Sequence, residues 1–134
     1  MMNENILIDT NILIYSTDTG HIYYNYAISI IKNNLKNIFI TTKNVSEFVS
    51  VLTKINIDYS NIQKYLNLIQ KNYKILFPNE TSFEIFTSLL DKYKPKGNKV
   101  FDIEIVSIML ANKINKIATL NKKDFENIKE IILI

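Results

Sequence analysis

With 134 residues and a hydrophobic content of 47%, the chain favours one compact domain with a hydrophobic core, spanning residues 1–134, over two. The absence of cysteine excludes disulfides and a cysteine zinc site, and the lone His21 cannot supply a histidine-rich one, so any metal would be held by oxygen. The formal net charge of +3 at pH 7 suits a polyanionic partner but does not identify one.

The amino terminus, Met1 to Asn5, has neither the positive segment nor the long apolar run of a secretory signal, and Asp9 interrupts the apolar stretch behind it. No other run approaches the roughly 20 apolar residues that cross a bilayer. There is no low-complexity linker and no internal repeat. We therefore expect a cytoplasmic protein without membrane contact.

The first half of the chain alternates predicted strands and helices. Ile6 to Ile8 is a short, continuously apolar run, which is typical of a strand buried on both faces of a parallel sheet. Asp9 ends this strand, and Thr10 and Asn11 are good turn and cap residues. A short helix at 12–15, an amphipathic helix at 23–35 and a strand at 38–42 are expected next. A helix capped by Thr42 or Asn44 should then turn Val45, Phe48, Val49 and Leu52 inward. The following helix should be capped by Ser60 and have Tyr65, Leu66, Leu68 and Ile69 on its apolar face.

The second half continues the alternation. Apolar side chains surround nearly the whole circumference of a helix predicted over 101–114, so we expect it to be the most deeply packed one, with Asp102 at its start. The other expected elements are a strand at 75–77, a helix at 81–93 with Phe83, Phe86, Leu89 and Leu90 inside, a loop at 94–99, a strand at 116–120, a turn or short helix at 121–125, and a final strand at 128–133.

Strands that alternate with helices predict an α/β fold in which a mostly parallel sheet is covered on both faces. Binding sites in such folds lie beyond the carboxyl ends of the strands. The first and fourth predicted strands would bring Asp9 and the turn at 121–124 to that edge.

Four acidic residues that are far apart in the chain, Asp9, Glu47, Asp102 and Asp124, are each placed where a strand or helix end would aim them at one point. Carboxylates that close repel one another and raise one another's pKa, unless a cation holds them. Mg²⁺ and Mn²⁺ prefer such oxygen ligands and activate water against phosphate esters. The pattern therefore points to phosphodiester chemistry.

Four stretches of the sequence resemble the PIN-domain ribonucleases, and within them the small VapC-type toxins of toxin–antitoxin systems. They occur in the family's order and spacing and cover essentially the whole chain: 6–14 (ILIDTNILI), 42–52 (TKNVSEFVSVL), 100–111 (VFDIEIVSIMLA) and 117–125 (IATLNKKDF). The resemblance implies a three-layer α/β/α PIN-like domain that binds Mg²⁺ or Mn²⁺ and hydrolyses RNA as an endoribonuclease. It also implies a cognate antitoxin protein that covers the acidic groove, and a homodimer.

Carried over residue by residue, the resemblance assigns Asp9, Glu47 and Asp102 to the first three acidic positions of the family. At the fourth position many relatives have an acid in the place of Asn121, whereas others have an acid in the place of Asp124. An amide brings no charge, so we assign Asp124 as the fourth catalytic acid and Asn121 as an orienting neighbour.

The expected reaction is in-line attack of water on the scissile phosphate. The resemblance implies that it leaves a 5′-phosphate and a 3′-hydroxyl. Asp9, Asp102 and Asp124 are the expected metal ligands, and Glu47 is either a further ligand or the base that receives a proton. Asn11 and Thr119, with Asn121, are expected to hydrogen-bond the carboxylates and orient them. Three lysines around the loop before Asp102 are expected to bind the RNA backbone: Lys94, Lys96 and Lys99.

Two other functions stay open. A phosphatase that forms an aspartyl-phosphate would also place an aspartate such as Asp9 after a short apolar strand, but that chemistry wants a second acid where Asn11 stands. A catalytically silent RNA-binding or partner-binding module is the other alternative, and Asn121 is the residue that favours it.

Overall fold

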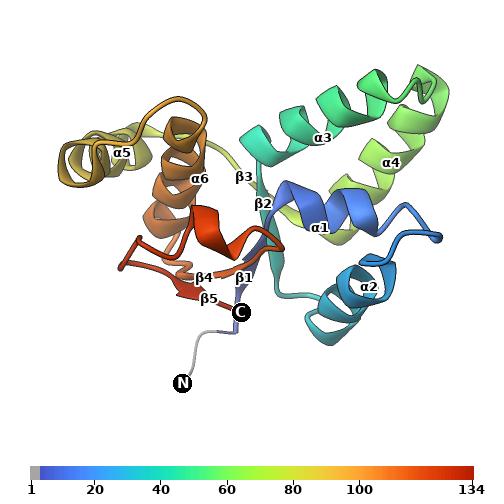
Figure 1. Ribbon diagram of the computed structural model, residues 1–134, viewed down its shortest axis with the longest axis horizontal. Coiled ribbons are helices and arrows are strands. Elements are labelled where there is room, and N and C mark those ends of the chain that lie inside the picture. Colours follow the sequence, from blue (N-terminus) through green and yellow to red (C-terminus); the bar gives the residue numbers. More distant parts are fainter. Residues whose placement is uncertain (1–3) are drawn as a thin grey trace.

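Five short parallel strands form the centre of the computed structural model, which describes residues 4–134 (Figure 1). The strands are β1 (Ile6–Ile8), β2 (Ile38–Thr41), β3 (Lys74–Leu76), β4 (Lys116–Ala118) and β5 (Ile132–Leu133). Their order in the sheet is β3-β2-β1-β4-β5, and each of the four pairings is parallel. The central position of β1 puts the residue that follows it, Asp9, at the middle of the carboxyl edge.

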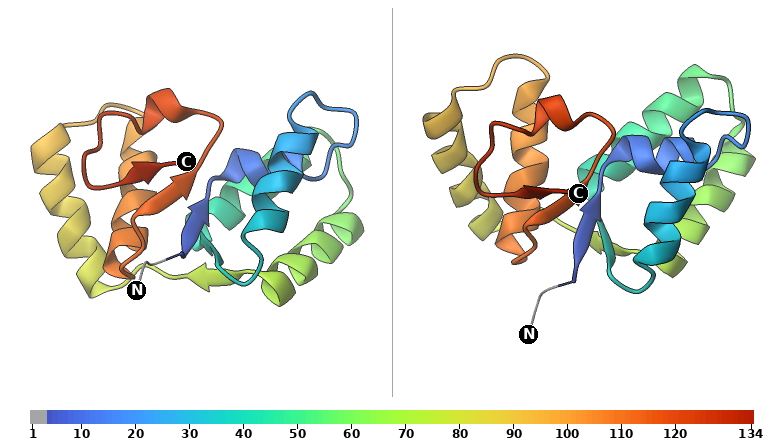
Figure 2. Two further views of the ribbon diagram at one scale, coloured as in Figure 1. Left: turned by 90° about the horizontal axis from the view of Figure 1, so that it is seen from below. Right: turned by 60° about the horizontal axis from the view of Figure 1, so that its bottom comes forward.

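The α-helices within residues 4–134 cover the sheet from two sides. They are α1 (Thr10–Tyr15), α2 (Tyr24–Asn33), α3 (Thr42–Lys54), α4 (Tyr59–Asn72), α5 (Glu80–Tyr93) and α6 (Lys99–Ala111). In Figures 1 and 2, α5 and α6 lie on one side of the strands and α1 to α4 on the other. The predicted three-layer α/β/α arrangement is confirmed.

The central strand is apolar throughout because both of its faces are buried. Successive side chains of a strand point to opposite faces. Leu7 accordingly packs into the core under α5 and α6, whereas Ile6 and Ile8 pack into the core under α1 to α4. The α6 helix has more buried residues than any other helix in the described part of the chain, as its apolar circumference predicts.

Two helix caps differ from the sequence prediction by a few residues. The N-cap of α3 is Thr41, not Thr42 or Asn44, and a reciprocal capping box joins Thr41 to Asn44. The N-cap of α4 is Asp58, not Ser60, because the Asp58 carboxylate accepts the backbone N–H of Asn61 at 2.9 Å. Several good cap formers stand side by side in both segments, so local sequence could not choose between them.

Three further expectations about packing and length were wrong. Leu68 is 56% exposed and Phe83 is 64% exposed, although both were placed on apolar helix faces. The final strand comprises only residues 132–133, because Ile128 and Ile131 enter the core under α5 and α6 from a non-strand segment. An apolar residue can be buried without belonging to a regular element, and periodicity does not reveal this.

None of the helices in residues 4–134 combines the length and apolar character that crossing a bilayer requires. The interpretation of Met1 to Asn5 as lacking a secretory signal falls mostly on residues 1–3, which lie outside the described residues.

Candidate functional site

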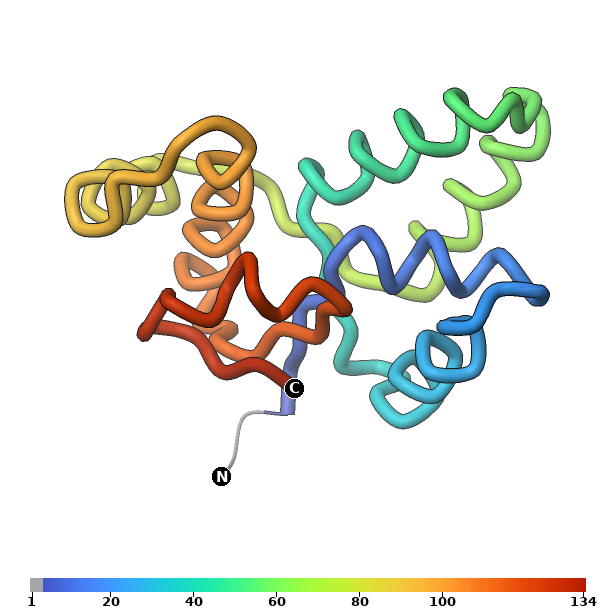
Figure 3. Tube along the Cα trace, in the orientation of Figure 1, coloured from blue at the N-terminus to red at the C-terminus, as the bar shows by residue number. Residues whose placement is uncertain are grey.

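The four acids that the sequence singled out line one cavity at the carboxyl edge of the sheet. Asp9 follows β1, Glu47 lies in α3, Asp102 lies in the first turn of α6, and Asp124 ends the short 3₁₀ helix η1 (Lys122–Asp124) behind β4. Figure 3 shows the chain leaving β4 and looping back to β5 through this turn. The cavity has a volume of about 350 Å³, and its walls include Asn11, Asn121 and all four carboxylates.

Asp9 is buried and held by three hydrogen bonds. Its Oδ1 accepts the backbone N–H of Thr10 at 2.8 Å, which caps α1. Its Oδ2 accepts the hydroxyl of Thr119 at 2.8 Å and the amide of Asn11 at 3.4 Å. Burial raises the pKa of Asp9, the hydrogen bonds from Thr119 and Thr10 lower it, and the charge of Asp124 raises it further. The carboxylate is therefore fixed in place at an energetic cost that a cation would offset.

The hydroxyl group of Thr119 donates its proton to Asp9, because its two other partners are both donors. Its hydroxyl oxygen accepts the amide of Asn11 at 3.3 Å and the backbone N–H of Asn121 at 3.0 Å, so its own hydrogen is left for the carboxylate. The amide oxygen of Asn11 accepts the N–H of Leu120 at 3.3 Å, which ties α1 to the end of β4. Asn11 and Thr119 thus hydrogen-bond Asp9 directly, whereas Asn121 is linked to it through its backbone N–H and Thr119.

The charged form of Asp102 is also disfavoured in the folded protein. Burial raises its pKa to about 7, with further contributions from the charges of Asp124, Asp9 and Glu47, whereas Lys99 acts in the opposite direction. The positive end of the α6 dipole also favours a charged acid in the first turn. Since the pKa is raised all the same, burial and repulsion outweigh the effect of Lys99.

Glu47 is oriented by a chain of buried polar side chains that sequence reasoning missed. The Thr10 hydroxyl donates to Glu47 Oε2 at 3.0 Å, and Asn44 Nδ2 donates to that hydroxyl at 3.1 Å. Asn44 is itself fixed, because its Oδ1 accepts the Thr41 hydroxyl at 2.8 Å and the Thr41 N–H at 2.9 Å. The only signal in the sequence was the spacing of Thr41 and Asn44, which fits a capping box but says nothing of Thr10.

The pKa of Glu47 is raised by burial first, and also by the charges of Asp9 and Glu104. The hydrogen bond from Thr10 and the charge of Lys43 lower it. Glu104, which lies in α6, is therefore close enough to Glu47 for its charge to act on that carboxyl group. A carboxylate with a raised pKa is better suited to accept a proton near neutral pH.

Replacing Asn44 with alanine should cost about 2 kcal/mol of stability, because the capping box is lost and two buried hydroxyls lose a partner. The RNA cleavage that the resemblance implies should also fall, because Thr10 is no longer held against Glu47. Urea denaturation and a cleavage assay measure the two effects. Ser82→Ala is the matched control, since Ser82 occupies the same position in the capping box of α5, away from the acids. Equal loss of cleavage in both variants would contradict a role for Asn44 in orienting Glu47.

The donor set fits a hard divalent cation in its chemistry, since four acidic residues line a common cavity and their carboxylates repel one another. In residues 4–134, however, no group of three acidic or histidine side chains converges closely enough to enclose a metal ion. The acids surround the cavity without meeting at one point. The assignment of Asp9, Asp102 and Asp124 as metal ligands stays a prediction.

The three lysines assigned to RNA binding are exposed but differ in their surroundings. Lys99 begins α6 and lines a cavity with Asp102 and Asp124. Lys94 is turned toward Asp91, with Nζ 2.8 Å from its carbonyl oxygen and 3.5 Å from its carboxylate. Lys96 lies in the loop between them. Their role in binding RNA stays a prediction, and Lys99 is the one beside the acids.

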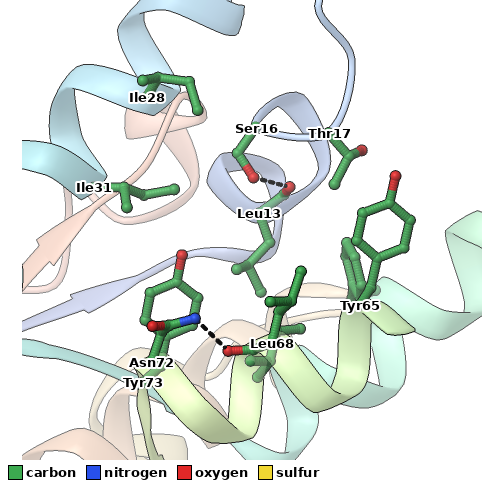
Figure 4. A pocket seen from close by; sticks show the side chains of 11 residues that line it. Leu13, Ser16, Thr17, Ile28, Ile31, Tyr65, Leu68, Asn72 and Tyr73 are labelled. Carbon is green, nitrogen blue, oxygen red and sulfur yellow. Dashed lines mark hydrogen bonds between the residues drawn. The ribbon is translucent and has the colours of Figure 1, made fainter. Parts of the chain in front are cut away.

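A separate cavity of about 250 Å³ lies between α1, α2 and α4 (Figure 4). Its lining includes Leu13, Ile28 and Tyr65, and the Asn72 side chain on its wall donates to the Leu68 carbonyl at 2.8 Å. No carboxylate lines it, so it offers no ligand set for a hard cation.

Comparison with known proteins agrees with this architecture. A sequence profile of the PIN domain matches residues 6–131. The chain therefore belongs to the PIN domain family. A search of curated protein sequences found no match.

Three solved structures illustrate the shared fold. A chain of a toxin–antitoxin complex from Klebsiella pneumoniae is 22% identical, with a TM-score of 0.74 and 96% of each chain covered. VapBC-1 from nontypeable Haemophilus influenzae is 20% identical, with a TM-score of 0.75 and the same coverage. VapC20 from Mycobacterium tuberculosis, a toxin that cleaves the sarcin-ricin loop, is 11% identical, with a TM-score of 0.74 over 95% of this chain and 98% of that one.

Proposed function

We propose that this protein is a metal-dependent endoribonuclease that hydrolyses RNA phosphodiester bonds, and that it is the toxin of a type II toxin–antitoxin pair. One observation carries the proposal. Four carboxylates from four distant stretches of a PIN-domain chain line the same cavity at the carboxyl edge of its sheet. Capping of α1 accounts for Asp9 alone, and core packing needs no mutually repelling acids there, so a ligand is the physical reason for gathering four of them.

In this proposal Asp9, Asp102 and Asp124 would hold Mg²⁺ or Mn²⁺. When bound, such an ion supplies Lewis acidity to the scissile phosphate and to the attacking water. Glu47 accepts the proton of that water: Thr10 holds Oε2, which leaves Oε1 for the proton. The products would carry a 5′-phosphate and a 3′-hydroxyl.

The fourth acidic position can be assigned by separate Asn121→Ala and Asp124→Ala variants. Of these two residues, Asp124 alone carries a charge, and this charge raises the pKa of Asp102 and of Asp9. We therefore expect Asp124→Ala to lower the cleavage rate at least about tenfold more than Asn121→Ala does. Asn121 contributes its backbone N–H to Thr119, and an alanine there keeps that group. Initial rates of RNA cleavage at saturating Mg²⁺ decide the question. A larger loss in the Asn121 variant would assign the position to Asn121.

A single set of assays separates the proposal from its two rivals. The purified protein is incubated with total RNA under titration with Mg²⁺ and Mn²⁺, with EDTA as control, and the RNA ends are sequenced. Cuts that require metal support the nuclease. Hydrolysis of phosphate monoesters without RNA cleavage favours the aspartyl-phosphate phosphatase, and RNA binding without turnover favours the silent module.

The partner proposals follow from the same family context, since the similar structures from Klebsiella and Haemophilus are toxin–antitoxin complexes. We propose a cognate antitoxin that covers the acidic groove, a homodimer, and a cytoplasmic site of action. Co-purification with the product of an adjacent gene tests the antitoxin, and light scattering of the purified chain tests the dimer. A monomer at micromolar concentration would contradict the latter.

A further inference from the structure

A second opening beside the acids has walls of mixed chemistry. It has a volume of about 380 Å³ and is lined by Lys43, Glu47, Asn98, Phe101, Asp102 and Asp124. Three of these residues also line the cavity of the four acids, so the two spaces adjoin. The remaining wall presents a cation and an aromatic ring, from the start of α3 and the first turn of α6.

Lys43 and Phe101 contact each other across these two helices. The Lys43 ammonium lies 4.0 Å from the centroid of the Phe101 ring, and Phe101 is 44% exposed. Within residues 4–134, Lys43 forms no salt bridge, although three carboxylates share its cavity. The lysine charge is nevertheless close enough to lower the pKa of Glu47.

The other two cation–π pairs in residues 4–134 differ from the Lys43–Phe101 pair in their surroundings. Lys92, which lies over Tyr93, is also bonded to the Glu130 carboxylate at 2.7 Å. Lys74 lies 5.4 Å from the Phe39 ring, at the start of β3 and so at the opposite edge of the sheet from the acids. Only the Lys43–Phe101 pair, among those in residues 4–134, adjoins the acidic cavity.

We propose that Lys43 and Phe101 form the binding subsite for an unpaired nucleotide next to the scissile phosphodiester of an RNA strand. The inference rests on the proposed nuclease function and adds the residues that hold the RNA strand beside the acids. Lys43 contacts the phosphate, and the base stacks on the Phe101 ring.

The physical need for such a subsite comes from the acids themselves. Four carboxylates repel the phosphates of RNA, so a cation outside the metal-binding set is required to hold the backbone beside them. A phosphate is a stronger partner for an ammonium group than an aromatic ring is, so RNA would draw Lys43 from Phe101 and leave the ring face for a base. Stacking on a side chain requires an unpaired base, because a paired base is already stacked within the helix.

The test measures binding separately from cleavage. A fluorescently labelled oligouridine is titrated with Asp9→Asn protein in Mg²⁺, so that no RNA is cut, and its anisotropy gives the Kd. Lys43→Ala and Phe101→Leu, each in this background, should weaken binding by about tenfold, and Lys43→Arg should keep most of it. The matched controls, Lys74→Ala and Phe83→Leu, remove the same groups away from the cavity and should leave the Kd unchanged.

Several outcomes overturn the proposal. Unchanged binding in both Lys43→Ala and Phe101→Leu does so, provided that their melting temperatures match the parent. The proposal is also overturned if Lys43→Ala abolishes cleavage in the otherwise wild-type protein but leaves binding unchanged in the Asp9→Asn background. Lys43 would then act on Glu47 and not on the RNA. If Phe101→Leu weakens binding of a duplex of the same length as much as binding of the single strand, stacking on an unpaired base is excluded.

Failure of the nuclease proposal gives a different pattern. If the wild-type protein binds the oligouridine through Lys43 and Phe101 but cuts no RNA in any metal, the subsite stands and the silent RNA-binding module is favoured. If the wild-type protein cuts RNA and neither variant changes binding, the nuclease stands and the subsite is wrong.

Discussion

Asp102→Asn is expected to lower RNA cleavage by more than about 100-fold and, without metal, to raise the melting temperature at pH 8. The cleavage is lost because the amide brings no negative charge to a cation at the carboxyl edge. The stability rises because the substitution removes a partly buried charge that Asp124, Asp9 and Glu47 repel. A functional residue that destabilises the free protein should show both effects together.

The stability of the metal-free protein should depend on pH through the protonation of Asp102. The pKa of Asp102 is raised from 3.8 to about 7 in the folded protein, so the folded state binds this proton more tightly than the unfolded state. The stabilisation is fully present below about pH 4 and is lost as the pH rises through about 7. The metal-free wild-type protein should therefore lose stability between these limits, and Asp102→Asn should lose less. Thermal melting in EDTA at a series of pH values measures the difference.

The matched control is Asp91→Asn, which removes the same charge from an exposed position on α5. It should change neither cleavage nor the slope of stability against pH. If the Asp102 variant cleaves RNA as fast as wild type, Asp102 has no part in the reaction. If its metal-free stability falls at pH 8, the repulsion inferred for the acidic cavity is wrong.

Asp9→Asn is expected to abolish cleavage, with a loss of more than about 100-fold, and to leave the fold intact. An asparagine oxygen can still accept the Thr10 N–H and cap α1, so this helix should remain folded. The amide nitrogen, in contrast, meets the Thr119 hydroxyl and the Asn11 amide, which now donate to a group that cannot accept. Charge and orientation are lost together.

Cleavage rates and circular dichroism compare this variant with Asp18→Asn, a change at an exposed aspartate whose side chain accepts the Gly20 N–H. The Asp18 variant should cleave normally. Residual activity within tenfold of wild type in Asp9→Asn would remove Asp9 from the metal-binding set. Loss of helical signal would show that the main role of Asp9 is to cap α1.

Local patterns in the sequence were sufficient for the layers of this fold. The apolar run of Ile6 to Ile8 predicted a doubly buried strand, because a strand between two helical layers has no polar face. The all-round apolar α6 was predicted for the same reason. Chain topology then required residues after β1 and β4 to share one edge, since these strands are parallel neighbours.

Two other features could not be predicted from local patterns. The exposure of Leu68 and Phe83 depends on which part of a helix the neighbouring elements cover. The choice of Thr41 and Asp58 as caps depends on which of several suitable residues the preceding strand or turn leaves in extended conformation. Both are decided by packing between elements.

The sequence by itself determined the α/β class, the parallel strands whose carboxyl ends bring Asp9 and Asp124 to one edge, and the acidic character of the site. Only the tertiary structure decided how the acids are held and surrounded: the Asn44–Thr10 bond joins residues 34 positions apart, and the Thr119–Asp9 bond joins residues 110 positions apart. Lys43 likewise meets Phe101 only because α3 and α6 begin at the same edge. Periodicity and capping rules act within a few residues, whereas side-chain contacts across elements are fixed by how the whole chain packs.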